Sequence, residues 1–249
     1  MRQAFDRALH DARVSAYVPG EFVGQESFMT ASEIRALAAR AGIGPGTTVL
    51  DLCCGVAGPG RFIARELDCD YLGVDASTSA VAIASERADG LPCSFETAHV
   101  PPLPAGSFDV VLLLETMLAF EDKETLARAI AAALRPGGRF AFTLEEGQPL
   151  TSAERAAMPA ADTVWPIRLD AMAAILERVG LVIAWQEDHT AAHLATARAL
   201  TDAFAADGEH IATQIGQTAV NDLLAAHRVW IDWLDSGRIR KLALLAERA

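Results

Sequence analysis

Two aspartates lie at the ends of neighbouring apolar runs, separated by a turn of small residues. Asp51 belongs to the run over residues 48–52, which predicts a buried strand. Gly55 and Gly58 follow in a turn that leads into a helical pattern, so backbone N–H groups at the helix start can approach a ligand closely. Asp75 ends a second apolar run about one βα unit later, where an acid commonly binds the two hydroxyls of a ribose. The pattern predicts a nucleoside-binding crevice.

The turn after Asp51 distinguishes two classes of nucleoside cofactor. A nicotinamide-binding fold uses G-x-G-x-x-G directly after the strand. Residues 53–58 read C-C-G-V-A-G instead and lack the first glycine. Asp51 would also repel a pyrophosphate, whereas its carboxylate suits a cationic group of the ligand. An NAD(P)-dependent oxidoreductase is therefore the less favoured alternative.

Residues 49–60, V-L-D-L-C-C-G-V-A-G-P-G, resemble motif I of class I S-adenosylmethionine (SAM)-dependent methyltransferases. Cys53 and Ala57 replace two glycines of that motif, and both are small enough to keep the turn. The resemblance implies that SAM is the cofactor and that the carboxylate of Asp51 lies near its amino group. Among such enzymes, the small-molecule methyltransferases of the sarcosine/dimethylglycine and UbiE-like kind are the most similar.

Further motifs follow in the order that the family requires. Residues 73–77, G-V-D-A-S, look like its ribose-binding motif, and Ala80 stands where the family packs on adenine. Residues 95–99 stand where the family usually has an acid for the adenine amino group. Thr97 replaces that acid, and its hydroxyl can accept the same hydrogen bond. Two more segments resemble the family's approaches to its fourth and fifth strands: residues 103–111 and 134–140. The resemblance assigns these residues to the cofactor: Asp51, Cys53, Gly55, Gly58, Asp75, Ala76, Ala80, Thr97, Ala98, His99 and Leu113.

Alternating strand and helix patterns predict an α/β fold with a doubly wound, mostly parallel, Rossmann-like sheet. That the last strand runs antiparallel is implied by the resemblance alone. The expected strands are 47–52, 70–74, 92–96, 108–114, 138–143, 182–185 and 239–246. The expected parts are an N-terminal helical lid segment (1–46), the SAM-binding core (47–187), a helical cap insertion (188–236) and the final strand of the core (237–249).

Two segments are candidates to cover the crevice. Residues 17–28 carry aromatic side chains between glycines, which suits a lid with hinges. Residues 188–236 are helical in pattern and too long for a simple connection. We interpret them as a cap over the acceptor pocket, with extra core or a homodimer surface as the alternative.

Methyl transfer from a sulfonium needs alignment and exclusion of water more than proton transfer, because the methyl group is already electrophilic. Glu115, which follows the fourth predicted strand, is the candidate catalytic residue, as a base or as a contact to the acceptor. We interpret His189 and His193 as ordinary helical histidines and His99 as packing on the cofactor. The candidate substrate-binding residues are Tyr17, Phe28, Met117, Glu145 and Trp165.

The composition limits the remaining possibilities. The formal charge of −12 and the lack of a basic cluster argue against a nucleic-acid partner. No apolar run is long enough to cross a membrane and the start lacks a signal core, so we expect a cytoplasmic protein. The spacing of the four cysteines predicts neither a metal site nor a disulfide.

The sequence therefore predicts a SAM-dependent methyltransferase that acts on a small-molecule acceptor. A non-catalytic SAM-binding module remains an alternative, beside the oxidoreductase. The sequence leaves open whether the acceptor atom is nitrogen, oxygen or carbon.

Overall fold

The structure, a computed structural model, describes residues 7–157 and 164–248. It contains a seven-stranded sheet in the order β3-β2-β1-β4-β5-β7-β6, in which β7 is antiparallel to both of its neighbours. The predicted fold class, including the antiparallel last strand, is confirmed. The strands are β1 (Thr48–Leu52), β2 (Asp70–Asp75), β3 (Cys93–Thr97), β4 (Phe108–Leu113), β5 (Leu134–Glu146), β6 (Leu181–Asp188) and β7 (Arg240–Arg248).

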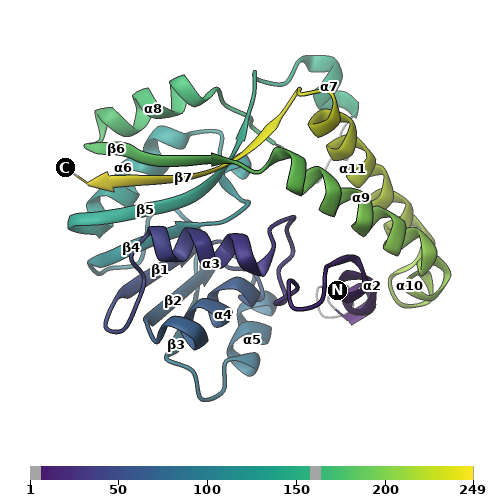
Figure 1. Cartoon of the computed structure of the whole chain (residues 1–249), viewed down its shortest axis with the longest axis horizontal. Helices are drawn as coiled ribbons and strands as arrows, with labels where there is room; N and C mark the ends of the chain where they lie inside the picture. Colours follow the sequence, from purple (N-terminus) through teal and green to yellow (C-terminus); the bar gives the residue numbers. More distant parts are fainter. Residues whose placement is uncertain (1–6, 158–163, 249) are drawn as a thin grey trace.

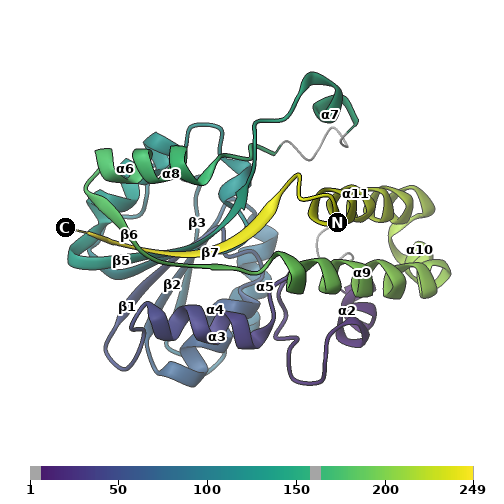
Figure 2. The same cartoon turned by 45° about the horizontal axis from the view of Figure 1, so that its top comes forward.

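Helices cover both faces of the sheet, and a further group projects from one end (Figures 1 and 2). Helices α3 and α4 pack on one face, and α6 and α8 pack on the other. The helices of these layers are α3 (Ala31–Arg40), α4 (Gly58–Leu67), α5 (Thr78–Arg87), α6 (Lys123–Ala133) and α8 (Leu169–Arg178). The remaining elements are α2 (His10–Ala16), η1 (Met117–Ala119), α7 (Ser152–Ala157), α9 (Thr190–Ala206), α10 (Gly208–Ile215) and α11 (Gln217–Asp235). No helix in the described ranges is both long and apolar enough to cross a membrane.

The capping of α3 follows from its sequence. Thr30 accepts a hydrogen bond from the backbone N–H of Glu33, and the Glu33 carboxylate accepts one from the N–H of Thr30. This reciprocal pair satisfies two donors that a helix start otherwise leaves unpaired. Thr30 is thus the N-cap of α3, and Glu33 is fixed where its side chain reaches the histidines at the start of α9.

The predicted start of the fifth strand was wrong. β5 begins at Leu134, directly after α6 ends at Ala133, instead of at residue 138. Pro136 disfavours helical geometry in the residue before it, so the chain extends earlier than the glycines alone suggest. Leu134 then pairs with Phe108 on β4, and an irregularity follows in that pairing.

The N-terminal segment and residues 188–236 pack on each other. Leu9 and Tyr17 share a buried apolar cluster with Phe204 of α9, Ile211 of α10 and Val220 of α11. Figure 2 shows α2 beside α9, and both lie at the end of the sheet where β1 and β4 have their carboxyl ends. In contrast, α3 packs on the sheet, so the part of residues 1–46 that joins the projecting helices precedes α3.

Candidate active site

The turn between β1 and α4 is shaped by residues in left-handed conformations. Cys53, Gly55 and Ala57 have φ values of 58°, 56° and 54°. A non-glycine residue adopts this region only at a cost, so the surrounding structure must hold the turn in place. The turn forms one side of a cavity of about 260 Å³. The cavity is lined by Gly24, Glu26, Ser27, Asp51, residues 53–59, Asp75, Leu114, Glu115 and Thr116.

Asp75 is oriented by two backbone donors. Its Oδ2 accepts from the N–H of Gly55 at 2.9 Å, and its Oδ1 accepts from the N–H of Ser77 at 2.8 Å. These bonds tie the end of β2 to the turn after β1 and aim the carboxylate at the cavity. A carboxylate oxygen can accept more than one hydrogen bond, so Asp75 can still receive bonds from the two hydroxyls of a ribose.

Asp51 is buried at the floor of the same cavity and accepts a hydrogen bond from the Tyr71 hydroxyl at 2.5 Å. Burial raises the pKa of Asp51 to about 7, and the nearby charge of Asp75 adds to this shift. A buried carboxylate of this kind favours a cationic partner, which would restore its charged form. The α-amino group of SAM provides such a cation, so the chemistry of the cavity fits this cofactor.

Only some of the predicted cofactor residues line this cavity. Cys53, Gly55 and Gly58 line the cavity beside the two aspartates. The remaining predicted residues do not line it. Ala76, Thr97 and His99 are exposed, Ala98 is half-buried, Ala80 packs against Val56, and Leu113 lies in the core while Leu114 lines the cavity.

The N-terminal segment lies directly on the turn. A Cβ atom placed on Gly58 would be 2.2 Å from the carbonyl oxygen of Gly24. Gln25 is buried and holds this segment in shape: its amide donates to the carbonyls of Glu21 and Met29, and its oxygen accepts from the N–H of Val23. The segment therefore packs closely on the turn, and its Gly24, Glu26 and Ser27 line the cavity.

A second cavity, of about 460 Å³, lies under the projecting helices. Tyr17 and Phe28, two of the predicted substrate-binding residues, line it. Met117 is buried in the core and Trp165 faces elsewhere, while their neighbours Leu118 and Val164 line the cavity instead. The other lining residues are Arg13, Gln25, Glu26, Ser27, Glu115, Ala119, Leu200, Phe204, Leu223, Ala226, His227, Trp230 and Lys241.

The two cavities adjoin, because Glu26, Ser27 and Glu115 line both of them. Glu115 follows β4 with φ 56°, and its backbone N–H donates to the Thr143 hydroxyl at 2.5 Å. A group that bound in the first cavity could thus meet a molecule in the second at this point. The two cavities therefore have one wall in common.

Lys241 joins two buried glutamates beside this wall. Its Nζ lies 2.7 Å from Glu115 Oε2 and 2.6 Å from Glu145 Oε1. Burial opposes the charges of Glu115 and Lys241, yet Lys241 lowers the pKa of Glu115, and the two glutamates raise the pKa of Lys241. Glu115 is therefore held as a carboxylate, which makes it a weak base. Glu145, a predicted substrate contact, is 1% exposed and faces Lys241 instead of either cavity.

His227 is a cavity residue that the sequence analysis does not select. Its Nδ1 lies 2.9 Å from the Leu223 carbonyl, which can only accept, so Nδ1 carries the proton in this hydrogen bond. Burial lowers the pKa of His227, and its ring lies edge-on to Phe28 and Phe204. The remaining nitrogen, Nε2, is then an unprotonated acceptor. Helical spacing with Leu223 and Trp230 places His227 on one face of α11, and this was the only signal for it in the sequence.

Comparisons with known proteins agree with the site. Residues 49–138 match the family model described as a methyltransferase domain. One relative, phosphoethanolamine N-methyltransferase 3 of Arabidopsis thaliana, is 38% identical over 103 residues, which make up 40% of this chain and 21% of that protein. The chain spans about a fifth of the length of this and three similar plant relatives.

Solved structures share the fold over most of the chain. A protein assigned as a sarcosine dimethylglycine methyltransferase from Galdieria sulphuraria has a TM-score of 0.78 at 14% identity, covering 88% of this chain and 85% of that one. Phosphoethanolamine N-methyltransferase 2 of Haemonchus contortus, solved with phosphomonomethylethanolamine and S-adenosylhomocysteine, has a TM-score of 0.80 at 20% identity, covering 98% of this chain and 57% of that one.

The chain therefore carries a methyltransferase domain, and its sheet is that of the class I, SAM-dependent enzymes. The predicted methyltransferase class is confirmed for residues 49–138, and the predicted cofactor, SAM, agrees with the S-adenosylhomocysteine bound in the Haemonchus contortus structure. The matches give no support to the NAD(P)-dependent alternative.

Proposed function

We propose that the protein transfers the methyl group of SAM to a hydroxyl group of a small, mainly apolar molecule. The observation that carries this proposal is the pair of adjoining cavities with Glu26, Ser27 and Glu115 in common. When bound, SAM supplies an electrophilic methyl group. The protein contributes alignment and the exclusion of water, which can lower the barrier by roughly 7–11 kcal/mol.

Asp75 and Asp51 would hold the cofactor from two sides. Asp75 is already oriented by Gly55 and Ser77, so it would bind the ribose hydroxyls with little rearrangement. Asp51 would pair with the amino group, opposite the hydroxyl of Tyr71. Residues 23–24 close over the turn and keep water from this end of the site.

The lining of the larger cavity favours an uncharged acceptor. Most of its side chains are apolar or aromatic. Its two cationic side chains already have acidic partners: Lys241 pairs with two glutamates, and Arg13 lies 3.4 Å from Glu26. A phosphate, which the phosphoethanolamine relatives would have to bind, would compete with those carboxylates for the same cations.

A cationic acceptor is disfavoured by the position of Lys241. Its ammonium lies 5.3 Å from the ring centroid of Trp230 and 5.6 Å from that of Phe28. Aromatic faces of this kind could bind an acceptor's ammonium group, but Lys241 already provides the cation. A hydroxyl or phenol is left as the acceptor that the lining suits best.

A hydroxyl acceptor has to lose a proton, and His227 would take it. Its Nδ1–H is fixed by the Leu223 carbonyl, so Nε2 is available as a base on the wall of the cavity. The lowered pKa of His227 keeps the ring neutral near pH 7. Glu115, which is paired with Lys241, would instead shape the passage between the cavities.

The test is a transfer assay with methyl-labelled SAM and three kinds of acceptor: apolar phenols and alcohols, phosphoethanolamine, and sarcosine. We expect label on the hydroxyl compounds and little on the other two. Transfer to phosphoethanolamine or sarcosine, with the hydroxyl compounds inert, would show that the acceptor class is wrong. If calorimetry finds SAM binding but no acceptor reacts, the non-catalytic alternative gains support.

A further inference from the structure

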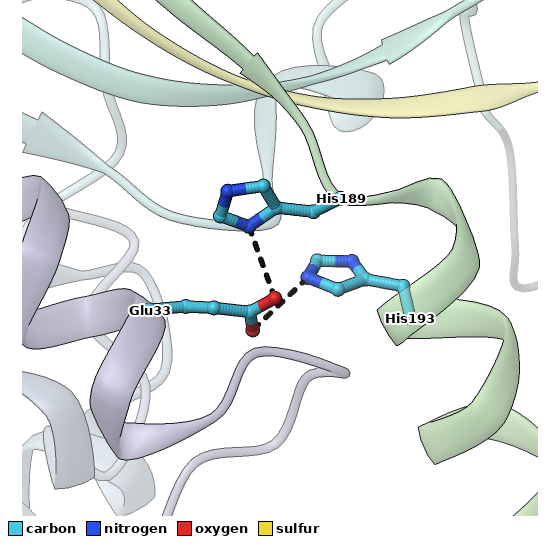
Figure 3. A group of neighbouring side chains, drawn as sticks. All are labelled: Glu33, His189 and His193. Atoms are coloured by element: carbon cyan, nitrogen blue, oxygen red, sulfur yellow. Dashed lines mark ion pairs between the residues drawn. The ribbon is translucent and has the colours of Figure 1, made fainter.

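Two histidines and a glutamate from three distant parts of the sequence meet beside the site. His189 precedes α9 and His193 lies one turn into it, so both side chains project from one side of the helix, and Glu33 reaches them from α3 (Figure 3). Glu33 Oε1 lies 3.0 Å from His189 Nδ1, and Glu33 Oε2 lies 3.4 Å from His193 Nε2. One possible ligand atom from each residue lies within 4.8 Å of the others.

We propose that Glu33, His189 and His193 bind a divalent transition-metal ion such as Zn²⁺. Two imidazoles and one carboxylate, with a fourth position for water, are a common ligand set for this ion. Tetrahedral bonds of about 2.1 Å place ligand atoms about 3.4 Å apart, which lies within the 4.8 Å that encloses one ligand atom from each residue. This inference goes beyond the proposed function and differs from the sequence prediction of no metal site.

His193 provides the second, independent observation. It is 1% exposed, and among the described residues neither of its ring nitrogens has a hydrogen-bond partner. Such a side chain is costly to bury. A metal ion bound to Nε2 satisfies that nitrogen directly, and it also fixes the proton on the other nitrogen, Nδ1.

The second ring nitrogen of His193, Nδ1, faces a carboxylate oxygen that could accept its hydrogen bond. Nδ1 of His193 lies 3.8 Å from Glu115 Oε1, a buried oxygen that also has no hydrogen-bond partner in the described part of the chain. Metal-binding histidines usually donate their second N–H to a carboxylate or carbonyl. A small movement would form this bond, so one ion accounts for three unpaired buried atoms.

The surroundings of His189 and Glu33 also suit a role as metal ligands. His189 Nε2 lies 3.6 Å from Glu187 Oε2, which again places a carboxylate behind a candidate ligand. Glu33 is held by the N–H of Thr30, so its carboxylate is fixed in direction before any ion binds. The ion would join α3 to α9 and orient Glu115 at the shared wall of the two cavities.

The test measures metal binding and not methyl transfer, so it is independent of the proposed function. Untagged protein is freed of metal with a chelator and titrated with Zn²⁺ by calorimetry, and with Co²⁺ by visible absorption. We expect one ion per chain and a Co²⁺ spectrum typical of low coordination number. His193→Gln and Glu33→Gln should each weaken binding by more than about 100-fold, beyond the loss typical of residues behind a ligand.

His210 gives a matched control, because it is an exposed histidine on α10, outside the cluster. His210→Gln should bind Zn²⁺ like the parent, and Zn²⁺ should raise the unfolding temperature of both but not of His193→Gln. If His193→Gln does not fold, His189→Gln replaces it, because His189 is less buried. Absence of stoichiometric binding by the parent, or equal binding by the cluster variants, would overturn the proposal and leave a hydrogen-bonded ion-pair cluster.

Discussion

Lys241 Nζ and Glu115 Oε2 are 2.7 Å apart, although the two residues are separated by 126 positions in the sequence. Lys241 lies on β7, and Glu115 follows β4. Both side chains are almost fully buried, and Glu145 on β5 supplies a second carboxylate to the same ammonium group. Residues on β5 and β7 and one just beyond β4 are thus tied together at the wall that the two cavities share.

Removing the ammonium should destabilise the protein. Lys241→Met leaves Glu115 and Glu145 as buried carboxylates without a cation, and breaking a buried ion pair typically costs about 3–5 kcal/mol. Chemical denaturation of parent and variant measures the free energy of unfolding. The triple variant with Glu115→Gln and Glu145→Gln should recover most of the loss. If Lys241→Met is as stable as the parent, these contacts are not an energetically coupled cluster.

His227 should be needed for the chemical step. His227→Gln removes the base but keeps a polar side chain of similar size, so kcat should fall by about 10²–10⁴ while SAM affinity stays unchanged. Steady-state kinetics with a hydroxyl acceptor and calorimetry with SAM measure the two quantities.

Glu115→Gln is compared with His227→Gln to show which of the two residues is the base. If Glu115 were the base, kcat would fall with the KM of the acceptor nearly unchanged. Because Lys241 holds Glu115 as a carboxylate, we expect the change to appear mainly in KM. A large fall in kcat for Glu115→Gln with normal kcat for His227→Gln would reverse the two roles.

The cofactor side of the site could be predicted because its signals are local. Asp51 lies one residue before the end of β1 and Asp75 ends β2, and a turn of small residues follows β1, so chain order alone brings the two together. Lys241 could not be predicted, because only the pairing of β5 with β7 places it between two glutamates. The prediction of the residues that line the larger cavity was off by one position for a related reason. Beyond β4, Leu118 lines the cavity in place of the predicted Met117, and which of the two neighbours does so depends on how the chain packs.

Substitution of Asp75 should weaken SAM binding and so test the assignment of SAM as the cofactor. Hydrogen bonds to a charged group contribute about 1.5–3 kcal/mol, so Asp75→Ala should weaken SAM binding by about ten- to a hundred-fold. Asp70→Ala is the matched control, since Asp70 is an exposed acid at the start of the same strand. Calorimetric titration gives both affinities. Equal SAM affinity for parent and Asp75→Ala would remove Asp75 from the site.

Asp51 should make SAM binding depend on pH. Its pKa of about 7 in the folded protein means that it is increasingly protonated below pH 7, and a neutral acid cannot pair with the cofactor's ammonium group. SAM affinity should therefore be lower at pH 6 than at pH 8, and Asp51→Asn should remove the difference. A pH-independent affinity in the parent would contradict this assignment.

Asp51 should also make the free energy of unfolding depend on pH, in the direction opposite to its effect on SAM affinity. The folded-state pKa of about 7 exceeds the ordinary value of 3.8, so between these values the folded state binds more protons than the unfolded state. The contribution of Asp51 to stability therefore declines as pH rises from about 4 through 7. Asp51→Asn should flatten this part of the stability profile measured without SAM, after correction for the groups that both proteins share.

The close contact between Gly58 and Gly24 should determine whether residues 14–28 can close over the turn after β1. In the parent, hydrogen exchange over residues 14–28 should slow when SAM binds, because closure removes the backbone from water. Gly58→Ala places a Cβ 2.2 Å from the Gly24 carbonyl oxygen, so the cover must move away, SAM should bind more weakly, and the SAM-induced protection should be lost. Gly44→Ala is the control, because a Cβ there meets no atom within 4 Å. Unchanged protection in Gly58→Ala, or none gained by the parent, would show that residues 14–28 are a fixed part of the fold and not a lid.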